Sequence, residues 1–223
     1  MLLLAVDTSG KQGSIALARC GPGDACEVIE TVPLTGGTFS AALVPEIAAL
    51  LGQHGLSKTD IGAFVIVSGP GSFTGLRISL AAIKALAEVL AKPIAAVSML
   101  EVLATSGSQG IVTAALDAGR NEVFLGECEV RGAVTNVIRE RLLARDQWLE
   151  SARDPLIVTP DKIVAEAARA KAFQVLEVER PRADAVARLG CWKIGSGETV
   201  SPEALEAKYI GQSDSEIFVK SGS

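Results

Sequence analysis

The composition and charge of the chain limit what it can be. It has 223 residues, 48% of them hydrophobic, which is enough for one large or two small domains with a real core and excludes a disordered chain. The formal net charge of -5 lacks the basic surplus of a stand-alone nucleic-acid binder, so a partner would have to supply most contacts to RNA phosphates. The apolar start MLLLAVDTSG has no basic region or cleavage site of a signal peptide, and no run is long enough to span a bilayer. We therefore expect a cytoplasmic protein that does not contact membranes.

The cysteines and the single histidine offer no catalytic or metal-binding pattern. No two cysteines form a Cys-x-x-Cys pair, so we expect free thiols in a reducing compartment and no metal site. His54 precedes Gly55 at a predicted helix end, where a cation meets the carboxyl-end dipole, and no nucleophile lies near it in the sequence. The four cysteines are Cys20, Cys26, Cys128 and Cys191.

The first half of the chain predicts a layered α/β domain. Three strands come first, followed by a helix that we expect to begin near Leu43 or Val44, because Pro45 fits the first turn of a helix. The continuous apolar run GAFVIVSG is typical of a strand covered on both faces in a parallel sheet, and a long apolar helical pattern follows it. This order of elements is typical of an α/β layer arrangement. The predicted strands span 2–7, 14–19, 26–34, 62–69 and 93–98, and the second helix spans 76–91.

The second half begins by repeating the pattern of the first. In GIVTAALDAGRNEVFLGECEV, an apolar strand ends in an aspartate, a small polar turn follows and an apolar strand returns, so Asp117 corresponds to Asp7. The repeat predicts two related domains, which we place at 1–107 and 108–223. A short helix is predicted at 99–106, further strands at 155–160 and 172–179, helices at 161–170 and 183–195, and a mobile tail after Ile210.

The segment VSGPGSFTGLRIS (67–79) joins the apolar strand to the long helix and raises the question of a ligand site. It is not a P-loop, because the residues after Gly75 are not Lys and Ser/Thr, and it is not a nucleophile elbow, because phenylalanine takes the place of the serine. The glycines permit close backbone approach, and Ser72 or Thr74 can cap the helix. The segment is therefore either a tight turn that packs a helix on a sheet or an anion site at the amino end of the helix.

Two aspartates at the ends of corresponding strands are further candidates for a ligand site. Asp7 and Asp117 could hold a hydrated Mg²⁺ beside a nucleotide phosphate, or each could cap its own turn. The candidate nucleotide- or anion-binding residues are Asp7, Thr8, Ser9, Gly71, Ser72, Thr74, Gly75, Arg77 and Asp117.

The sequence GPGSFTGLRIS, followed by AAIKALAEVLAKPIAAVSMLEVLA, resembles the TsaB (YeaZ) family. This family is the bacterial subunit of the machinery that makes threonylcarbamoyl-adenosine next to the anticodon of tRNAs reading ANN codons. LLAVDTS, SAALVPEIAALLGQHGLSKTDI, ALDAGRNEVFLG and SPEALEAKYI extend the resemblance over most of the chain, more loosely in the second half. It implies an α/β fold of the actin/Hsp70-like ATPase (ASKHA) type, with two ribonuclease-H-like lobes whose mixed sheets are flanked by helices.

The resemblance also implies a relationship to TsaD, the catalytic paralogue, which holds a metal through a His-x-x-x-His motif. Met99 and Leu103 stand where the two histidines would be, and neither side chain replaces an imidazole on a metal. We therefore expect no catalytic residue, no metal site and no cofactor required by this subunit, with ATP or ADP a candidate ligand at the interface of the complex.

The partners follow from the same resemblance. It implies that helices of the first lobe bind TsaD, that the ATPase TsaE docks on the complex, that the chain forms a homodimer without TsaD, and that tRNA is contacted only through the complex. The helix 76–90 is apolar nearly all round, so a partner or a neighbouring helix must cover its second face. The candidate partner-binding residues are Leu43, Ile47, Leu51, Ile78, Ala82, Ile83 and Leu86.

The residues and the resemblance leave two candidate functions. The first is a non-catalytic scaffold and activating subunit for tRNA threonylcarbamoylation. The alternative is a small ATP-dependent kinase of the same superfold, in which Asp7 and Asp117 frame Mg·ATP, although the chain is short for that class. A peptidase is not supported, because the sequence has neither a metal-ligand cluster nor a nucleophile triad.

Overall fold

The computed structural model describes residues 1–22, 25–132, 134–151 and 156–211. The chain forms two compact units: Met1–Met99 with Pro181–Lys208, and Leu100–Arg180 with residues 209–211 of the described chain. The tail predicted to be mobile lies, beyond residue 211, outside the described residues.

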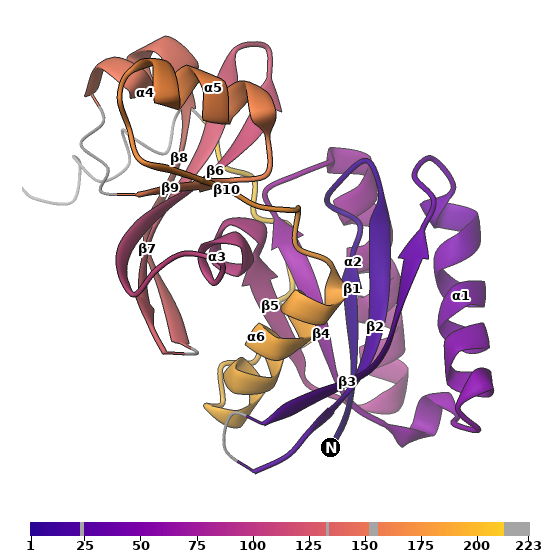
Figure 1. Ribbon diagram of the computed structural model, residues 1–223. Coiled ribbons are helices and arrows are strands. Elements are labelled where there is room, and N and C mark those ends of the chain that lie inside the picture. The colour runs from indigo at the N-terminus through magenta and orange to yellow at the C-terminus, as the bar shows by residue number, and fades with distance from the viewer. Residues whose placement is uncertain (23–24, 133, 152–155, 212–223) are drawn as a thin grey trace, which may run out of the picture. The chain divides into compact units, whose positions relative to one another are not determined.

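The first unit contains a mixed five-stranded sheet in the order β3-β2-β1-β4-β5 (Figure 1). Its first three strands form an antiparallel meander, and β4 and β5 run parallel to β1. The strands β1 and β4 are buried along most of their length, as their continuous apolar sequences predicted. The strands are β1 (Leu2–Asp7), β2 (Gly13–Cys20), β3 (Cys26–Leu34), β4 (Ile61–Gly69) and β5 (Ile94–Ser98).

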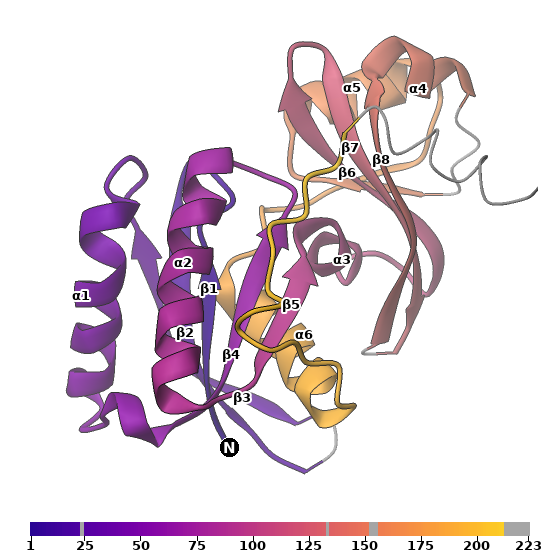
Figure 2. The same ribbon diagram turned by 180° about the vertical axis from the view of Figure 1, so that it is seen from behind.

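Helices cover both faces of this sheet. The helices α1 (Phe39–Gln53) and α2 (Phe73–Leu90) lie side by side on one face, and α6 (Ala183–Gly195) lies on the other (Figures 1 and 2). Burial on both sides explains why the central strands have no polar alternation. A short 3-10 helix, Lys58–Asp60, leads into β4.

The helix α1 begins earlier than the sequence predicted, so Pro45 lies inside it rather than in its first turn. Phe39 anchors the start of the helix because its ring is buried against Gly13 of β2. The proline removes the hydrogen bond to the carbonyl of Ala41. Ala41 is exposed, so water can satisfy that carbonyl and the helix continues.

The second unit repeats the topology of the first. Its sheet has the order β10-β9-β6-β7-β8, in which β6, β7 and β8 are antiparallel neighbours and β9 and β10 run parallel to β6. Trp148 is buried in its core and stacks on Phe173 with ring centroids 6.4 Å apart. The two sheets confirm the predicted α/β fold of two related lobes. The elements are α3 (Met99–Ala104), β6 (Gly110–Gly119), β7 (Glu122–Arg131), β8 (Val134–Ala144), α4 (Arg145–Ser151), β9 (Ile157–Thr159), α5 (Lys162–Ala170) and β10 (Val175–Glu177).

The two units divide the chain differently from the domains 1–107 and 108–223 that the sequence predicted. From Leu100 on, α3 belongs to the second unit, where Leu100 lies against Gly126 of β7. The last helix, α6, returns to the first unit. It is fixed there by a 2.8 Å hydrogen bond from the Ala183 N–H to Ser14 Oγ and by close packing of Gly190 on Val65. Each unit is thus completed by the helix that follows the last strand of the other.

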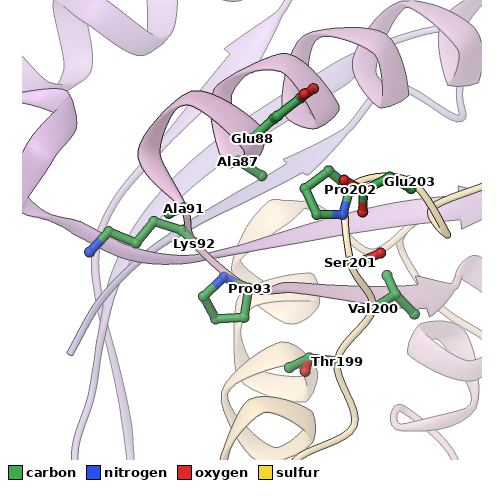
Figure 3. A pocket seen from close by; sticks show the side chains of 10 residues that line it. All are labelled: Ala87, Glu88, Ala91, Lys92, Pro93, Thr199, Val200, Ser201, Pro202 and Glu203. Carbon is green, nitrogen blue, oxygen red and sulfur yellow. The ribbon is translucent and has the colours of Figure 1, made fainter.

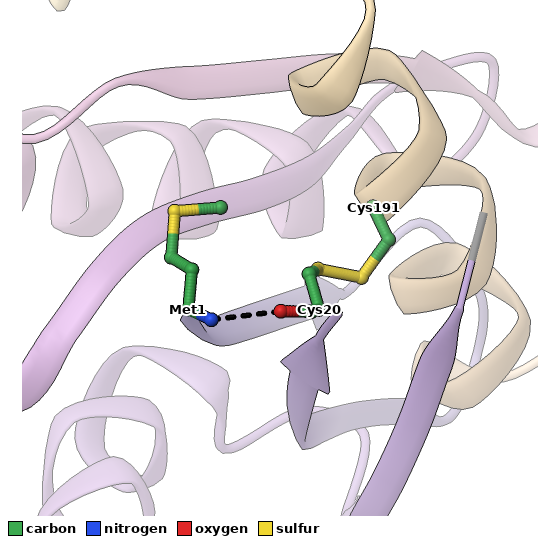
Figure 4. The surroundings of a disulfide bond; sticks show 3 residues. All are labelled: Met1, Cys20 and Cys191. Carbon is green, nitrogen blue, oxygen red and sulfur yellow. Dashed lines mark hydrogen bonds between the residues drawn. A yellow bond between two sulfur atoms is a disulfide. The ribbon is translucent and has the colours of Figure 1, made fainter. Parts of the chain in front are cut away.

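The return of α6 also corrects the expectation that all four cysteines are free. Cys20 at the end of β2 and Cys191 in α6 form a disulfide, with Cα atoms 5.7 Å apart (Figure 4). The amino group of Met1 donates a 2.7 Å hydrogen bond to the carbonyl of Cys20 beside it. Cys26 and Cys128 take no part in this disulfide. The sequence could not show this pairing, because 171 residues separate its two cysteines.

Candidate functional site

The turn after β1 and the loop after β4 lie together at one edge of the first sheet. The two strands are adjacent and parallel, so their carboxyl ends meet at that edge. The Ser72 N–H donates a 2.8 Å hydrogen bond to the carbonyl of Ser9, which joins the loop to the turn. The sheet topology therefore brings the sequences DTS and GPGSFTG into direct contact.

The glycines of the loop allow this contact. A Cβ atom on Gly71 would overlap the backbone oxygen of Ser9, and one on Gly75 would overlap the backbone oxygen of Thr8. Backbone therefore packs on backbone at both positions, which only glycine permits. Of the two readings of the loop, the tight turn that seats a helix accounts for both glycines.

Buried hydroxyl groups complete the junction. Thr8 Oγ1 lies 2.8 Å from the carbonyl oxygen of Gly75 and 2.7 Å from Ser79 Oγ. Ser72, one of the two predicted capping residues, is the N-cap of α2, and its Oγ accepts a 3.3 Å hydrogen bond from the Gly75 N–H. Thr8 and Ser79 are fully buried, so these hydrogen bonds are made away from competing water.

Asp7 holds the turn after β1 in shape. Its Oδ1 accepts hydrogen bonds from the N–H of Ser9, at 2.8 Å, and from the hydroxyl of Ser9, at 2.6 Å. This is the turn-capping role that the sequence offered as one alternative.

Asp117 makes the corresponding contacts in the second unit, at the end of β6. Its Oδ1 accepts hydrogen bonds from Arg145, at 3.2 Å, and from the Gly119 N–H, at 3.3 Å, while its own N–H donates to Asp161 Oδ2 at 2.8 Å. The carboxylates of both aspartates therefore have protein partners.

The remaining candidates of the loop lie on its exposed side. Thr74 is exposed at the start of α2. The guanidinium carbon of Arg77 lies 3.7 Å from the ring centroid of Phe73, which is a cation–π contact. Phe73 is 52% exposed, so this pair lies at the surface, beside the junction rather than in it.

The predicted partner-binding residues divide into two groups. Leu43, Ile47, Leu51 and Ile83 are buried in the first unit, so they hold α1 and α2 on the sheet and are not available to a partner. The prediction that these four residues bind a partner was wrong because helical spacing identifies an apolar face but does not show whether the sheet or a partner covers it. Ile78, Ala82 and Leu86 are only partly buried.

The outer surface of α1 is unusually apolar, and α2 adds exposed apolar side chains beside its exposed Arg77 and Glu88. The exposed positions of α1 from 41 to 49 carry no charge, and its only charged residue, Glu46, is half-buried. Val44 is 54% exposed and Val89 is 77% exposed. Helical spacing did not point to these side chains, because the apolar spacing in the sequence marks the face that the sheet buries. The exposed apolar residues of this outer face are Ala41, Val44, Pro45, Ala48 and Ala49 on α1 and Phe73, Ala81, Ala85 and Val89 on α2.

A pocket of about 470 Å³ lies at the other end of α2 (Figure 3). The carboxyl end of α2 and the segment Thr199–Glu203 form its walls. A hydrogen bond from the Ser201 side chain lowers the pKa of Glu203 on its rim. The 18 residues of α2 place this pocket about 27 Å from the start of the helix at 1.5 Å per residue, so it is separate from the junction described above.

The described residues offer no obvious catalytic centre. Among them, no three His, Cys, Asp or Glu side chains are placed to share a metal ion. His54 ends α1, and its Nε2 lies 2.7 Å from a carboxylate oxygen of Glu30. Met99 and Leu103 are both fully buried. No helix in the described part of the chain is long and apolar enough to cross a membrane.

Two lobes with the same mixed five-stranded topology define an α/β protein of the actin/Hsp70-like type. Comparison with known proteins agrees with this class and narrows it. Residues 34–198 match the family described as "TsaD: tRNA N6-adenosine threonylcarbamoyltransferase". The tRNA threonylcarbamoyladenosine biosynthesis protein TsaB of Bacillus subtilis is 32% identical over 157 residues, which cover 69% of this chain and 67% of that protein.

Two further proteins match nearly the whole chain. TsaB of Escherichia coli is 27% identical over 223 residues, which cover 94% of each protein. The solved structure of YeaZ from Pseudomonas aeruginosa superposes with a TM-score of 0.78 at 25% identity, over 94% of this chain and 99% of that one. The chain belongs to the TsaD family and, within it, to the TsaB (YeaZ) proteins.

Proposed function

We propose that this chain is a non-catalytic scaffold and activating subunit for tRNA threonylcarbamoylation. In this role it binds the catalytic paralogue TsaD, together with the ATPase TsaE, for threonylcarbamoyl transfer to the adenosine next to the anticodon of ANN-reading tRNAs. The names of its relatives support the pathway. The assembly acts in the cytoplasm, and tRNA is bound through the complex because this chain carries a net charge of -5.

The observation that carries the proposal is the uncharged outer face of α1. A helix that lies on a sheet and faces water normally has charged residues on its outer side. Here Val44 and its exposed neighbours are small and apolar, which suits close packing against helices of another protein. The same face forms the homodimer when TsaD is absent, and ATP or ADP binds at the interface of the complex rather than in this subunit alone.

No observation favours the small-kinase alternative. That activity needs Asp7 and Asp117 beside Mg·ATP, yet Asp7 is hydrogen-bonded within its own turn and Asp117 to Gly119 and Arg145. The assay for it is direct: we expect no ATP turnover by the isolated chain, and robust turnover would revive this alternative.

The test of the scaffold role compares two exposed apolar residues. Val44→Glu places a charge on the outer face of α1, and Ile163→Glu places one at a position of similar exposure, 51%, on α5 of the second unit. Burying an unpaired charge at an interface is costly. We expect Val44→Glu to be monomeric by light scattering, to bind TsaD at least tenfold more weakly, and to support little threonylcarbamoylation in the reconstituted system.

The matched variant controls for a general effect of added charge. Ile163→Glu should dimerise, bind TsaD and support the reaction as the native chain does, and circular dichroism should show both variants folded. If Val44→Glu behaves like Ile163→Glu in all three assays, this face is not the docking surface and the proposal is wrong.

A further inference from the structure

Three of the four cysteines lie in one small region of the first unit. Cys20 is the last residue of β2 and Cys26 the first residue of β3, and the two stand directly opposite each other in the antiparallel ladder. Residues in such a pair project from the same face of the sheet, with Cα atoms about 4.5–5.5 Å apart. That separation lies within the range that a disulfide spans, about 4.4–6.8 Å.

The helix α6 supplies the third cysteine over that face. Cys191 is bonded to Cys20, so Cys20 points toward α6 (Figure 4). The helix contacts β3 as well as β2, and Cys26 projects from the same face of the sheet as its ladder partner Cys20. Cys20 therefore has two cysteines on the face that α6 covers, Cys191 on the helix and Cys26 on the neighbouring strand.

We propose that Cys20, Cys26 and Cys191 form a thiol–disulfide exchange triad in which the disulfide moves between two positions. The thiolate of Cys26 attacks Sγ of Cys20, the Cys20–Cys191 bond breaks, and a Cys20–Cys26 bond forms. Cys191 leaves as a thiolate and takes up the proton that Cys26 has lost. One disulfide is present before and after the step, so the exchange consumes neither oxidant nor reductant.

The two positions of the disulfide have different structural effects. The Cys20–Cys191 bond ties α6 to the sheet across 171 residues of sequence, whereas a Cys20–Cys26 bond stays within the β2–β3 hairpin and leaves α6 held by packing and by the hydrogen bond from Ala183 to Ser14. Burial raises the pKa of the Cys26 thiol, and the positive charge of Arg188 opposes that rise. The attacking thiolate is therefore scarce at neutral pH, and the exchange accelerates as the pH rises.

The test maps disulfides in the purified full-length chain. The protein is treated with oxidised glutathione, freed of it, held at pH 7 or pH 8, quenched in acid and blocked with N-ethylmaleimide. Trypsin releases Cys191 in the peptide LGCWK, and cleavage at Asp24 separates Cys20 from Cys26. We expect a Cys20–Cys191 link at the start, a Cys20–Cys26 link that grows with time, and a rate about tenfold higher at pH 8 than at pH 7.

Three variants make the result specific. Cys26→Ser should keep the Cys20–Cys191 link unchanged over the same period, and Cys191→Ser should form the Cys20–Cys26 link on oxidation. Cys128→Ser should exchange like the native chain, because Cys128 is buried on β7 in the second unit. If Cys26 stays free at both pH values, or if oxidised glutathione never joins Cys20 to Cys191, the triad does not exist. This inference is independent of the proposed function, since TsaD binding by the native chain would survive its failure.

Discussion

The backbone of Gly75, in the first turn of α2, lies directly against the carbonyl oxygen of Thr8, in the turn after β1. The two residues are 67 positions apart in sequence, and each lies beyond the end of one of two adjacent parallel strands, β1 and β4. This contact sets the position of α2 on the sheet. It thereby also sets the outer face through which we propose that the chain binds its partner.

Gly75→Ala should therefore destabilise the first unit. The new Cβ would overlap the Thr8 oxygen, which cannot move without distorting β1, and overpacking of this kind costs about 1–3 kcal/mol. Gly52→Ala is the matched control, because Gly52 is also helical and has no atom within 4 Å of a new Cβ. It should stabilise by about 0.5–1 kcal/mol. Urea unfolding measures both changes, and a Gly75→Ala variant as stable as Gly52→Ala would contradict the contact.

Thr8→Val should weaken the same junction by a different route. It removes the hydroxyl that bonds the Gly75 carbonyl and Ser79 in a fully buried setting, and unpaired buried polar groups cost about 1–3 kcal/mol. Thr8→Ser keeps the hydroxyl and loses only a methyl group. We expect the Ser variant to lie closer to the native chain than the Val variant in denaturant unfolding, and the reverse order would show that the methyl group matters more than the hydrogen bonds.

Local pattern was enough to predict the strands of the first unit and the resemblance of the two halves. The continuous apolar run before Gly69 predicted a buried strand, which the structure has as β4. Asp117 follows its apolar run as Asp7 follows the first one, which indicated that the two halves are related. The strand β8 was missed because its charged stretch IRERLL has no apolar alternation. One of these charges is paired across the ladder, where Arg139 lies opposite Glu127 at 3.3 Å.

Long-range contacts could not be read from the sequence. The amphipathic pattern of α6 showed that one of its faces is buried but not which sheet covers it, so it was assigned to the second lobe. The Cys20–Cys191 disulfide could not be predicted either, because it forms only where α6 packs on the first sheet. At the candidate site, the glycines of the loop were identified correctly as unusual, but the carbonyls of Thr8 and Ser9 that require them become visible only once the strand order is known.

Gly190→Ala tests whether α6 completes the first unit. A Cβ at this position would overlap the side chain of Val65 on β4, whereas one on Gly195, at the end of the same helix, has nothing within 4 Å. We expect Gly190→Ala to lose about 1–3 kcal/mol and Gly195→Ala to lose none. Hydrogen exchange locates the effect: amides of β1 and β4 should exchange faster in Gly190→Ala, while those of β6 and β7 should not change. Faster exchange confined to β6 and β7 would place α6 with the second unit instead.

The last prediction concerns acid pH and the turn that leads into β4. The N–H and hydroxyl of Ser57 donate hydrogen bonds of 2.7 and 2.8 Å to Asp60, and these bonds, the backbone one foremost, lower the pKa of Asp60 from its usual 3.8. Since the folded-state pKa lies below the unfolded value, the stabilisation is present above about pH 3.8 and is lost as the pH falls through the folded-state pKa. Ser57→Ala removes one of the two bonds, so the pKa of Asp60 should rise part of the way back. An NMR titration of the side-chain carboxyl carbon measures it in both proteins. A native Asp60 that titrates at or above 3.8 would contradict the capping interaction.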